Sequence, residues 1–365
     1  MVYKAIGLMS GSSLDGLDIA YVHLHETGGK WTYEILHTDC PSYSDLWIDK
    51  LSTAVNLPAA AYQLLHTDYG HYTGAAVNKF IDDNNLHHQV HLIASHGHTT
   101  FHIPKQKMTS QIGDGAAIAA VTGLPVVSDL RALDIAFGGQ GAPIVPIGEK
   151  LLLYDYELFL NLGGIANLSF NQPGKYIAFD VCPANRVLNL LIQNKGKSYD
   201  EEGKMAATGM VNNELLDKLN KLDYYRQAFP KSLANDFGTA TVYPLIQEYQ
   251  LSAEDALRTY VEHIALQVKH SVQTTMPGSM PNGQKLLITG GGAFNTFLVE
   301  RIREQLKEAG IEAIVPGKQL VNYKEALIMA LIGVLRWREE YNVLSSVTGA
   351  SRNSINGALW LGGEA

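Results

Sequence analysis

Two kinds of spacing alternate along the chain. In some stretches every second residue is apolar, as in strands, and in others apolar residues recur every three or four positions, as in helices. The pattern opens with two strand-like stretches around a polar turn at residues 10–16, which predicts a β-hairpin. The elements predicted for this first cycle are strands at residues 3–9, 17–24, 31–38, 90–94 and 125–128, and helices at residues 44–56, 59–84 and 113–122.

A second cycle of strands and helices begins near residue 158. Its predicted elements are strands at residues 158–162, 168–170, 176–179 and 285–289, and helices at residues 253–275, 295–309 and 322–341, with a loop at residues 276–284. For the last helix, Asn322 with Glu325 three residues later predicts an N-cap and a capping box. The chain thus begins with a hairpin, and a succession of strands and helices occurs twice along it. This pattern predicts an α/β fold.

Composition and charge narrow the classes of function. A length of 365 residues suggests two domains or one unusually large one, and 46% apolar with 18% charged residues excludes a disordered chain. The net charge of −8 argues against a nucleic-acid-binding protein, which is usually basic. The longest apolar run, residues 326–335, has 10 residues, against about 20 needed to span a membrane. No signal peptide is visible at the N-terminus, and Cys40 and Cys182 form no metal or redox motif, so we expect a cytoplasmic protein with reduced thiols.

Many of the 34 glycines cluster in three turns, each of which follows an apolar strand. Glycine lets a backbone approach a ligand closely, and consecutive N–H groups in such turns form an anion-binding nest. The first turn adds three hydroxyls and a carboxylate, which suit phosphate oxygens and a hydrated Mg²⁺. The candidate nucleotide-binding residues are Gly11, Ser12, Ser13, Asp15 and Gly16 in the first turn, Gly163 and Gly164 in the second, and Gly290, Gly291 and Gly292 in the third.

Taken singly, each turn is weak evidence, because an Asp-Gly turn in a hairpin is more often just a turn. The chain has no G-x-x-x-x-G-K-[ST] segment and no G-x-G-x-x-G that opens a helix after a strand. A P-loop ATPase and a simple dinucleotide-binding dehydrogenase are therefore disfavoured. Nucleotide binding shared between two lobes remains.

Residues 7–18, with the sequence GLMSGSSLDGLD, resemble the signature of the 1,6-anhydro-N-acetylmuramic acid kinases, which belong to the acetate and sugar kinase, Hsc70 and actin superfamily. The resemblance continues in the same order over nearly the whole chain. It includes residues 95–99, 111–115, 129–131, 138–143, 162–167, 290–292, 325–326 and 348–350.

The resemblance implies a fold and a reaction. The fold would be a two-lobed, actin-like ATPase with ribonuclease H-like lobes and an active-site cleft between them, with lobe I at residues 1–128 plus 350–365 and lobe II at residues 129–349. The implied enzyme uses ATP, Mg²⁺ and water to open the 1,6-anhydro bridge and to phosphorylate O6, which gives N-acetylmuramic acid 6-phosphate and ADP in peptidoglycan recycling.

Such a reaction needs a carboxylate that accepts a proton from water, as in an inverting glycosidase. The resemblance places this base at Asp180, just past the predicted strand 176–179; from the residues alone, an aspartate that caps the next helix is the alternative. Glu325 has two interpretations, the capping box and a role beside the sugar and the attacking water. By the same resemblance Asp15 and Asp180 hold Mg²⁺, directly or through water.

The remaining candidates concern the sugar. Arg131 is expected to pair with the lactyl carboxylate of muramic acid, with a structural arginine as the alternative. His96 and His98 would share one face of an ordinary strand and could donate hydrogen bonds to the sugar, and the resemblance adds Asn185. Zinc is disfavoured for these histidines because no H-E-x-x-H motif or cysteine pair accompanies them.

The chain departs from the family pattern at a few positions. His98 stands where glutamine is common, Ser12 replaces threonine, Cys182 precedes Pro183 where glycine is common, and residues 233–236 lack the usual glycine followed by a basic and an acidic residue. We expect Cys182 to change the local shape of the pocket, His98 to change recognition of the sugar, and residues 233–236 to change substrate scope or rate. Ser12 keeps the hydroxyl, and the carboxylate of Asp180 is retained.

Two rival functions remain open at this point. A conventional kinase of the same fold would use Asp180 to deprotonate a sugar hydroxyl instead of water. A non-catalytic sensor would bind ATP or a muropeptide fragment, although Asp15, Asp180, Glu325 and the three turns argue against it. The expected partners are ATP and a small sugar, without nucleic acid or membrane, and the sequence leaves open whether two copies form a homodimer.

Overall fold

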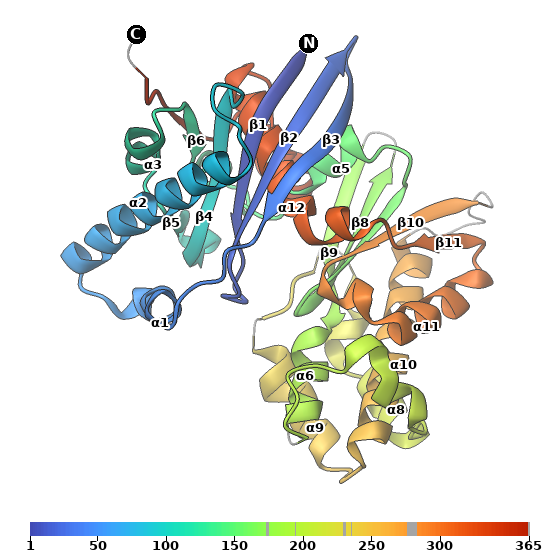
Figure 1. Cartoon of the computed structure of the whole chain (residues 1–365). Coiled ribbons are helices and arrows are strands. Elements are labelled where there is room, and N and C mark those ends of the chain that lie inside the picture. Colours follow the sequence, from blue (N-terminus) through green and yellow to red (C-terminus); the bar gives the residue numbers. More distant parts are fainter. Residues whose placement is uncertain (173–174, 194, 229–230, 235, 276–282, 364–365) are drawn as a thin grey trace. The chain divides into compact units, whose positions relative to one another are not determined.

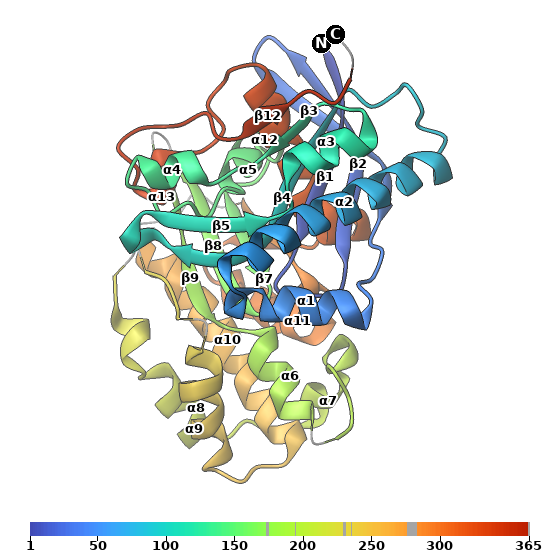
Figure 2. The same cartoon turned by 90° about the vertical axis from the view of Figure 1, so that its left-hand side faces the viewer.

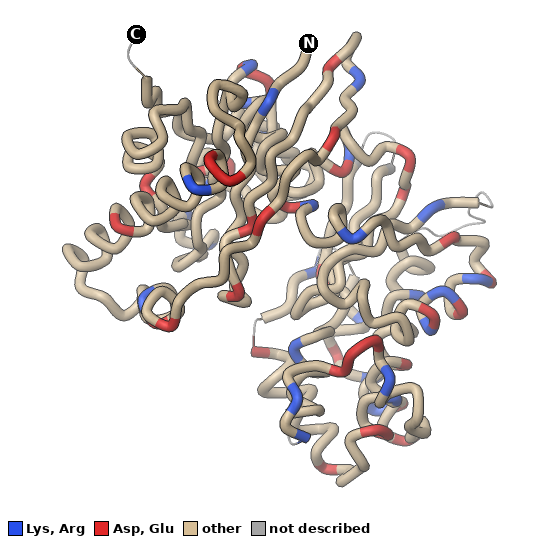
Figure 3. Tube along the Cα trace, in the orientation of Figure 1, with Lys and Arg blue, Asp and Glu red and all other residues tan. Residues whose placement is uncertain are grey.

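The computed structural model describes residues 1–365 except 173–174, 194, 229–230, 235, 276–282 and 364–365. The chain forms two compact units (Figure 1). Unit 1 comprises Met1–Tyr154 and Tyr323–Ala365, and unit 2 comprises Asp155–Asn322. Most of the predicted loop 276–284 lies outside the described residues, and Gln284 already belongs to a strand. Basic and acidic residues are interspersed over each unit, as Figure 3 shows.

Unit 1 is built on a seven-stranded mixed sheet of order β12-β6-β4-β1-β2-β3, with β5 paired to β4. The hairpin β1–β2 and strand β3 are antiparallel, whereas β1–β4 and β4–β6 are parallel. The strands are β1 (Val2–Ser10), β2 (Leu17–Thr27), β3 (Lys30–Asp39), β4 (Leu92–Ile103), β5 (Met108–Ile112), β6 (Val126–Ser128) and β12 (Ala358–Trp360). The helices are α1 (Asp45–Thr53), α2 (Ala59–Asp83), α3 (Gly115–Thr122), α4 (Ala132–Ala136), α5 (Pro146–Leu152), α13 (Ser345–Thr348) and the unit 1 part of α12 (Lys318–Trp337).

Both faces of this sheet are covered, which explains the long apolar runs of its central strands. On one face α2 lies across the strands (Figure 2), where Tyr69 and Phe80 pack in one buried cluster with Ile6 and Ile19. On the other face α12 approaches β1 so closely at Gly7 that any Cβ there would overlap the backbone of Ala326. Since glycine alone lacks a Cβ, Gly7 is what permits this packing.

Unit 2 has a five-stranded sheet of order β11-β10-β7-β8-β9 with β10 parallel to both β7 and β11. The strands are β7 (Leu158–Leu162), β8 (Ile165–Gln172), β9 (Lys175–Pro183), β10 (Gln284–Thr289) and β11 (Ile311–Ile314). The helices are α6 (Asn185–Gln193), α7 (Lys204–Thr208), α8 (Asn213–Asn220), α9 (Tyr243–Gln247), α10 (Ala253–Thr275) and α11 (Thr296–Lys307). Helix α10 is the centre of the helical layer, with Tyr260, Ile264 and Val268 fully buried. The α/β class and the two-part organisation are therefore as predicted.

The unit boundaries differ from the expected lobe boundaries at 128 and 349. Residues 129–154 and 323–349 belong to unit 1, because long-range contacts bind them to each other. Asp134 accepts a hydrogen bond from Oγ1 of Thr348 at 2.7 Å, and its backbone N–H donates to Asn356 at 2.9 Å. Lys324 and Glu149 form a buried ion pair. These partners are far apart in sequence, so turn chemistry could not reveal them.

Among the described residues, no helix combines the length and the apolar character that crossing a membrane requires.

Candidate active site

The first glycine-rich turn joins β1 to β2 in unit 1. Ser13 Oγ donates a hydrogen bond to Oδ1 of Asp15 at 2.6 Å, and both side chains are exposed. Gly16 is buried against the segment after β3, where a Cβ would crowd Sγ of Cys40 and the carbonyl of Pro41. The turn is thus fixed at Gly16, while the hydroxyls of Ser12 and Ser13 and the carboxylate of Asp15 are exposed, as binding of a phosphate or a hydrated cation requires.

Asp18, at the start of β2, is a site residue that the sequence pattern alone did not distinguish. Its pKa is raised to about 6, mainly by burial and also by the charges of Asp15 and Glu325, whereas a hydrogen bond with Cys40 opposes the shift. Unit 1 therefore gathers three carboxyl groups, Asp15, Asp18 and Glu325. The available signal was the spacing D-G-L-D, which repeats a carboxylate three residues after Asp15.

Glu325 lies on α12, and the predicted cap for this helix is wrong. The helix begins at Lys318 and passes through Asn322, with a non-helical backbone at Tyr323 (φ −115°, ψ 16°). Just after this kink, Nζ of Lys324 lies 3.1 Å from Oε1 of Glu149, and both side chains are only 5% exposed. The ion pair and the close contact at Gly7 hold the backbone on both sides of Glu325.

His96 and Arg131 form a direct pair in unit 1. Nε of Arg131 donates to Nε2 of His96 at 2.8 Å, and Nδ1 of His96 contacts the carbonyl of Gly97 at 2.9 Å. This pattern places the imidazole proton on Nδ1. The pKa of His96 is lowered to about 3, mainly by burial and also by the charge of Arg131. Burial also lowers the pKa of Arg131, to about 10, while Glu325 opposes the shift, so the guanidinium remains cationic at neutral pH.

His98 ends a chain of buried hydroxyls. Tyr43 bonds to Tyr69 and donates to Oγ of Ser10 at 2.8 Å, and Ser10 Oγ lies 3.0 Å from Nδ1 of His98. Because Ser10 already accepts from Tyr43, its own proton can go to Nδ1, which leaves N–H on Nε2 of His98 as a donor. Burial lowers the pKa of His98 and so favours the neutral ring.

We expected His96 and His98 to share one face because residues two positions apart point to the same side of an ordinary strand. Instead β4 has a register shift against β1, where Leu8 pairs with Ser95 and Ser10 with His98, and Gly97 has a φ of +73°. A Cβ at Gly97 would crowd the carbonyl of Ile112 on β5. The regular alternation is therefore interrupted between the two histidines, and each takes a partner of its own.

In unit 2 the second and third glycine turns pack against each other. The second turn, Gly163–Gly164, follows β7, and the third, Gly290–Gly292, follows β10, which lies parallel to β7. A Cβ at Gly290 would crowd Asn161 and Leu162, and one at Gly292 would crowd Leu162 and Asn185. Both turns thus lie at the carboxyl ends of parallel strands, where α/β proteins bind ligands.

Asn185 connects these turns to the start of α6. Its side-chain Nδ2 donates to the carbonyl of Leu162 at 3.0 Å, and its backbone N–H donates to Gly163 at 3.1 Å. The structure therefore brings together all the unit 2 candidates that the glycine pattern and the resemblance named, apart from Asp180.

Asp180 lies within β9, which continues to Pro183 rather than ending at Phe179. Its carboxylate accepts hydrogen bonds from Asn167 Nδ2 on Oδ1, and from Ser232 Oγ (3.0 Å) and Leu233 N–H (2.8 Å) on Oδ2. Since α6 begins at Asn185, Asp180 does not cap it, and that alternative is wrong. A carboxylate has about four acceptor positions, so one remains on Oδ1 beyond these three donors.

Two of the departures from the family pattern, at Cys182 and in the segment that begins with Leu233, lie near this carboxylate. Cys182 is fully buried, and burial raises the pKa of its thiol well above the ordinary value. Leu233 contributes the backbone donor to Asp180, while Asn235 lies outside the described residues. Cys40, likewise a free thiol, has a pKa raised to about 12 by burial and by the neighbouring charge of Asp18.

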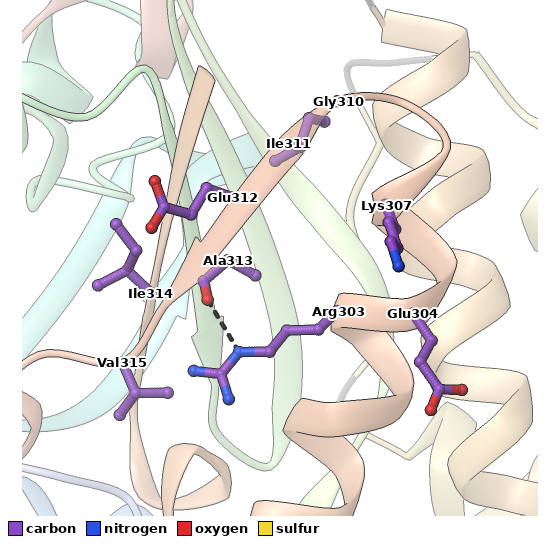
Figure 4. A pocket seen from close by; sticks show the side chains of 9 residues that line it. All are labelled: Arg303, Glu304, Lys307, Gly310, Ile311, Glu312, Ala313, Ile314 and Val315. Carbon is purple, nitrogen blue, oxygen red and sulfur yellow. Dashed lines mark hydrogen bonds between the residues drawn. The ribbon is translucent and has the colours of Figure 1, made fainter. Parts of the chain in front are cut away.

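A pocket of about 720 Å³ lies elsewhere in unit 2, along the edge strand β11 and the C-terminal end of α11 (Figure 4). The pocket is lined by both acidic and basic side chains. Nε of Arg303 donates a hydrogen bond to the carbonyl of Ala313 at 3.0 Å. None of the predicted site residues lines it. The glycine turns, at the carboxyl ends of β7 and β10, remain the better candidate for a nucleotide.

Comparison with known proteins assigns a family to this arrangement. The family model described as anhydro-N-acetylmuramic acid kinase matches residues 3–362. The anhydro-N-acetylmuramic acid kinase of Aliivibrio fischeri is 33% identical over 368 residues, which covers 98% of this chain and 99% of the relative. The one from Bacillus cereus is 33% identical over 381 residues, which covers 97% and 98%.

Among solved structures, the activator of 2-hydroxyisocaproyl-CoA dehydratase from Clostridium difficile with bound ADPNP aligns over 93% of this chain and 96% of that chain, with a TM-score of 0.45 and 14% identity. A likeness of this degree supports no conclusion about function. The family match over almost the full length does: the chain belongs to the anhydro-N-acetylmuramic acid kinase family and is a kinase.

Proposed function

We propose that this kinase converts 1,6-anhydro-N-acetylmuramic acid, ATP and water into N-acetylmuramic acid 6-phosphate and ADP. The observation that carries the proposal is the family match over residues 3–362, together with relatives of that name that align over almost their whole length. Such an enzyme would act in the cytoplasm and return a sugar of peptidoglycan to metabolism.

In the proposed reaction Asp180 is the general base. Water attacks the anomeric carbon, its proton passes to the open position on Oδ1 of Asp180, and the bond from C1 to O6 breaks. The released O6 forms the new bond to the γ-phosphorus of ATP as the bond to the β-phosphate oxygen breaks and ADP leaves. The hydrogen bonds from Asn167, Ser232 and Leu233 support this role because they fix the orientation of the carboxylate.

Sugar recognition is proposed for Arg131, His96, His98 and Asn185. Arg131 retains its charge at neutral pH, and a guanidinium forms paired hydrogen bonds with a carboxylate such as the lactyl group of muramic acid. Because Nε2 of His96 accepts a hydrogen bond from Nε of Arg131, His96 fixes the plane of the guanidinium for that contact. His98 would donate from Nε2, and Asn185 would supply an amide beside the glycine turns. Glu325, the other proposed catalytic residue, would orient the water.

Nucleotide binding is proposed for the three turns. The N–H groups at Gly11–Gly16, Gly163–Gly164 and Gly290–Gly292 would contact phosphate oxygens. The exposed carboxylate of Asp15, bonded to the Ser13 hydroxyl, offers the oxygen ligands that suit Mg²⁺, and Asp180 would contact the ion through water. When bound, Mg²⁺ would neutralise negative charge on the transferring phosphoryl group.

The decisive experiment is turnover in H₂¹⁸O followed by mass spectrometry. Water attack places one ¹⁸O at the anomeric carbon of the product. Because a free anomeric hydroxyl exchanges slowly with water, unlabelled N-acetylmuramic acid 6-phosphate must be incubated in parallel, and the enzymatic product must exceed it in label. Label no greater than in this control would overturn the water-attack mechanism and favour a conventional sugar-hydroxyl kinase.

The role of Asp180 is tested by Asp180→Asn with Asp223→Asn as the matched control, since Asp223 is an exposed carboxylate of the same unit. We expect at least about a thousandfold loss of kcat for Asp180→Asn and wild-type activity for the control. An Asp180→Asn enzyme that retains more than a tenth of the activity would remove Asp180 as the base.

A further inference from the structure

A cluster of two histidines and a glutamate lies on the hairpin formed by β2 and β3. His23 and His25 are two residues apart on β2 and therefore point to the same face of the sheet. Glu34 of β3 is directly opposite His23 in the strand register. One ligand atom of each residue lies within 4.8 Å of those of the other two, and Nε2 of His25 is 3.7 Å from Oε1 of Glu34.

The cluster is remote from the residues assigned to the kinase reaction. His25 is seven positions along β2 from Asp18, which corresponds to about 23 Å at 3.3 Å per residue. The cluster lies toward the free end of the hairpin in unit 1 (Figure 1). A ligand here would therefore be separate from the nucleotide and the sugar.

The hydrogen bonds around the cluster prepare it for a cation. Tyr21 donates its hydroxyl proton to the carbonyl of Gln89 at 3.3 Å, so its oxygen is an acceptor for Nε2 of His23 at 3.1 Å. This arrangement places the proton of His23 on Nε2 and leaves a lone pair on Nδ1. An outer hydrogen bond that fixes the tautomer is typical of metal-binding histidines.

His25 supplies the second observation. Its Nε2 atom is buried yet has no hydrogen-bond partner among the described residues. A buried polar atom without a partner is costly, and a bound ion would satisfy it. Glu34 is exposed and lies close enough to share that ion after a small side-chain rotation.

The charges that face the cluster are mixed. Burial lowers the pKa of His23, and Lys4 on β1, His25 and His91 lower it further, while Glu34 opposes the shift. Lys4 would repel a cation, and Glu34 would offset that repulsion.

We propose that His23, His25 and Glu34 bind a divalent transition-metal ion of the Zn²⁺ class. Two imidazoles and one carboxylate form a ligand set that suits Zn²⁺, with water in the remaining position, and they are poor ligands for Mg²⁺. The ligands come from two adjacent strands, and β3 is the edge of its sheet. The ion would therefore link the edge strand to β2 and stabilise this end of the hairpin.

The test uses the full-length protein freed of metal by chelation and without ATP. Zn²⁺ alone is titrated by calorimetry, and Co²⁺ absorption reports the ligand geometry. We expect one Zn²⁺ per chain, a higher melting temperature with Zn²⁺, and visible Co²⁺ bands typical of a four- or five-coordinate site.

His25→Ala and Glu34→Gln should each weaken Zn²⁺ binding by at least about tenfold. His71→Ala is the matched control, because His71 is an exposed histidine of unit 1 outside the cluster. The proposal is overturned if no Zn²⁺ binds, or if the bound equivalent persists unchanged in the double variant His25→Ala/Glu34→Gln, since the ion would then be held elsewhere. Circular dichroism verifies that each variant is folded.

Discussion

Nε of Arg131 donates a hydrogen bond to Nε2 of His96 over 2.8 Å, so a neutral histidine orients a buried cation. Nδ1 of His96 is in turn held by the carbonyl of Gly97. From the sequence, His96 was expected to bind the sugar directly. In the structure His96 instead hydrogen-bonds to Arg131, which is proposed to bind the sugar.

This pairing makes a prediction about sugar affinity. His96→Ala should raise KM for the anhydro sugar by about tenfold, because a hydrogen bond to a charged group contributes about 1.5–3 kcal/mol, while kcat should change less. His102→Ala is the control, since His102 is exposed and bonds to Thr109. Steady-state kinetics at saturating ATP measures both constants, and equal KM values in wild type and His96→Ala would contradict the prediction.

Asp18 makes stability depend on pH. Its pKa is about 6 in the folded protein, against 3.8 for an unperturbed aspartate. Between these values the folded state binds more protons than the unfolded state, so stability falls as the pH rises from about 4 to 6 and then levels off.

Asp18→Asn should remove that loss and be more stable than the wild type at pH 7.5, by at most about 3 kcal/mol. Urea unfolding of both proteins at pH 4.0 and pH 7.5 measures the difference. Asp49→Asn, which changes an exposed carboxylate of α1, should leave the pH dependence as in the wild type. A stability difference between Asp18→Asn and wild type that is the same at both pH values would refute the assignment.

The contact of β1 with α12 predicts a specific sensitivity at Gly7. Because a Cβ there overlaps the carbonyl of Ala326, Gly7→Ala should destabilise the protein by about 3 kcal/mol and displace Glu325, which precedes Ala326. At Gly317 nothing lies within 4 Å of an added Cβ, so Gly317→Ala should be tolerated. Thermal unfolding and kcat are measured for both. A Gly7→Ala protein of normal stability would show that the helix adjusts freely.

The buried ion pair of Glu149 with Lys324 predicts non-additive substitutions. Lys324→Met alone leaves a carboxylate buried beside an apolar chain and should cost about 3–5 kcal/mol of stability. The double variant Glu149→Gln/Lys324→Met removes both charges and should recover part of this loss. Denaturant unfolding of the two single variants and the double variant gives the coupling, and additive losses would mean that the pair contributes nothing as a pair.

Most secondary structure was predictable because it depends on local pattern. The predicted strand 158–162 and the predicted helix 253–275 coincide with β7 and α10. The prediction failed where distant residues intervene. Strand β4 continues to Ile103 because β5 pairs with it, and α12 begins four residues before Asn322. Short strands such as β12 depend on pairing with β6 and have little local signal.

For the candidate site, the sequence by itself determined the family, the three glycine turns and the residues that bear chemistry, because these are properties of residue type and order. The tertiary structure decided how those residues are paired and charged. In the structure His96 hydrogen-bonds to Arg131, and the carboxylate of Asp180 accepts hydrogen bonds from three donors. Burial raises the pKa of Asp18. Hydrogen bonds and desolvation depend on neighbours in space, and the partners of Arg131 and Asp180 lie between 13 and 53 positions away in the chain.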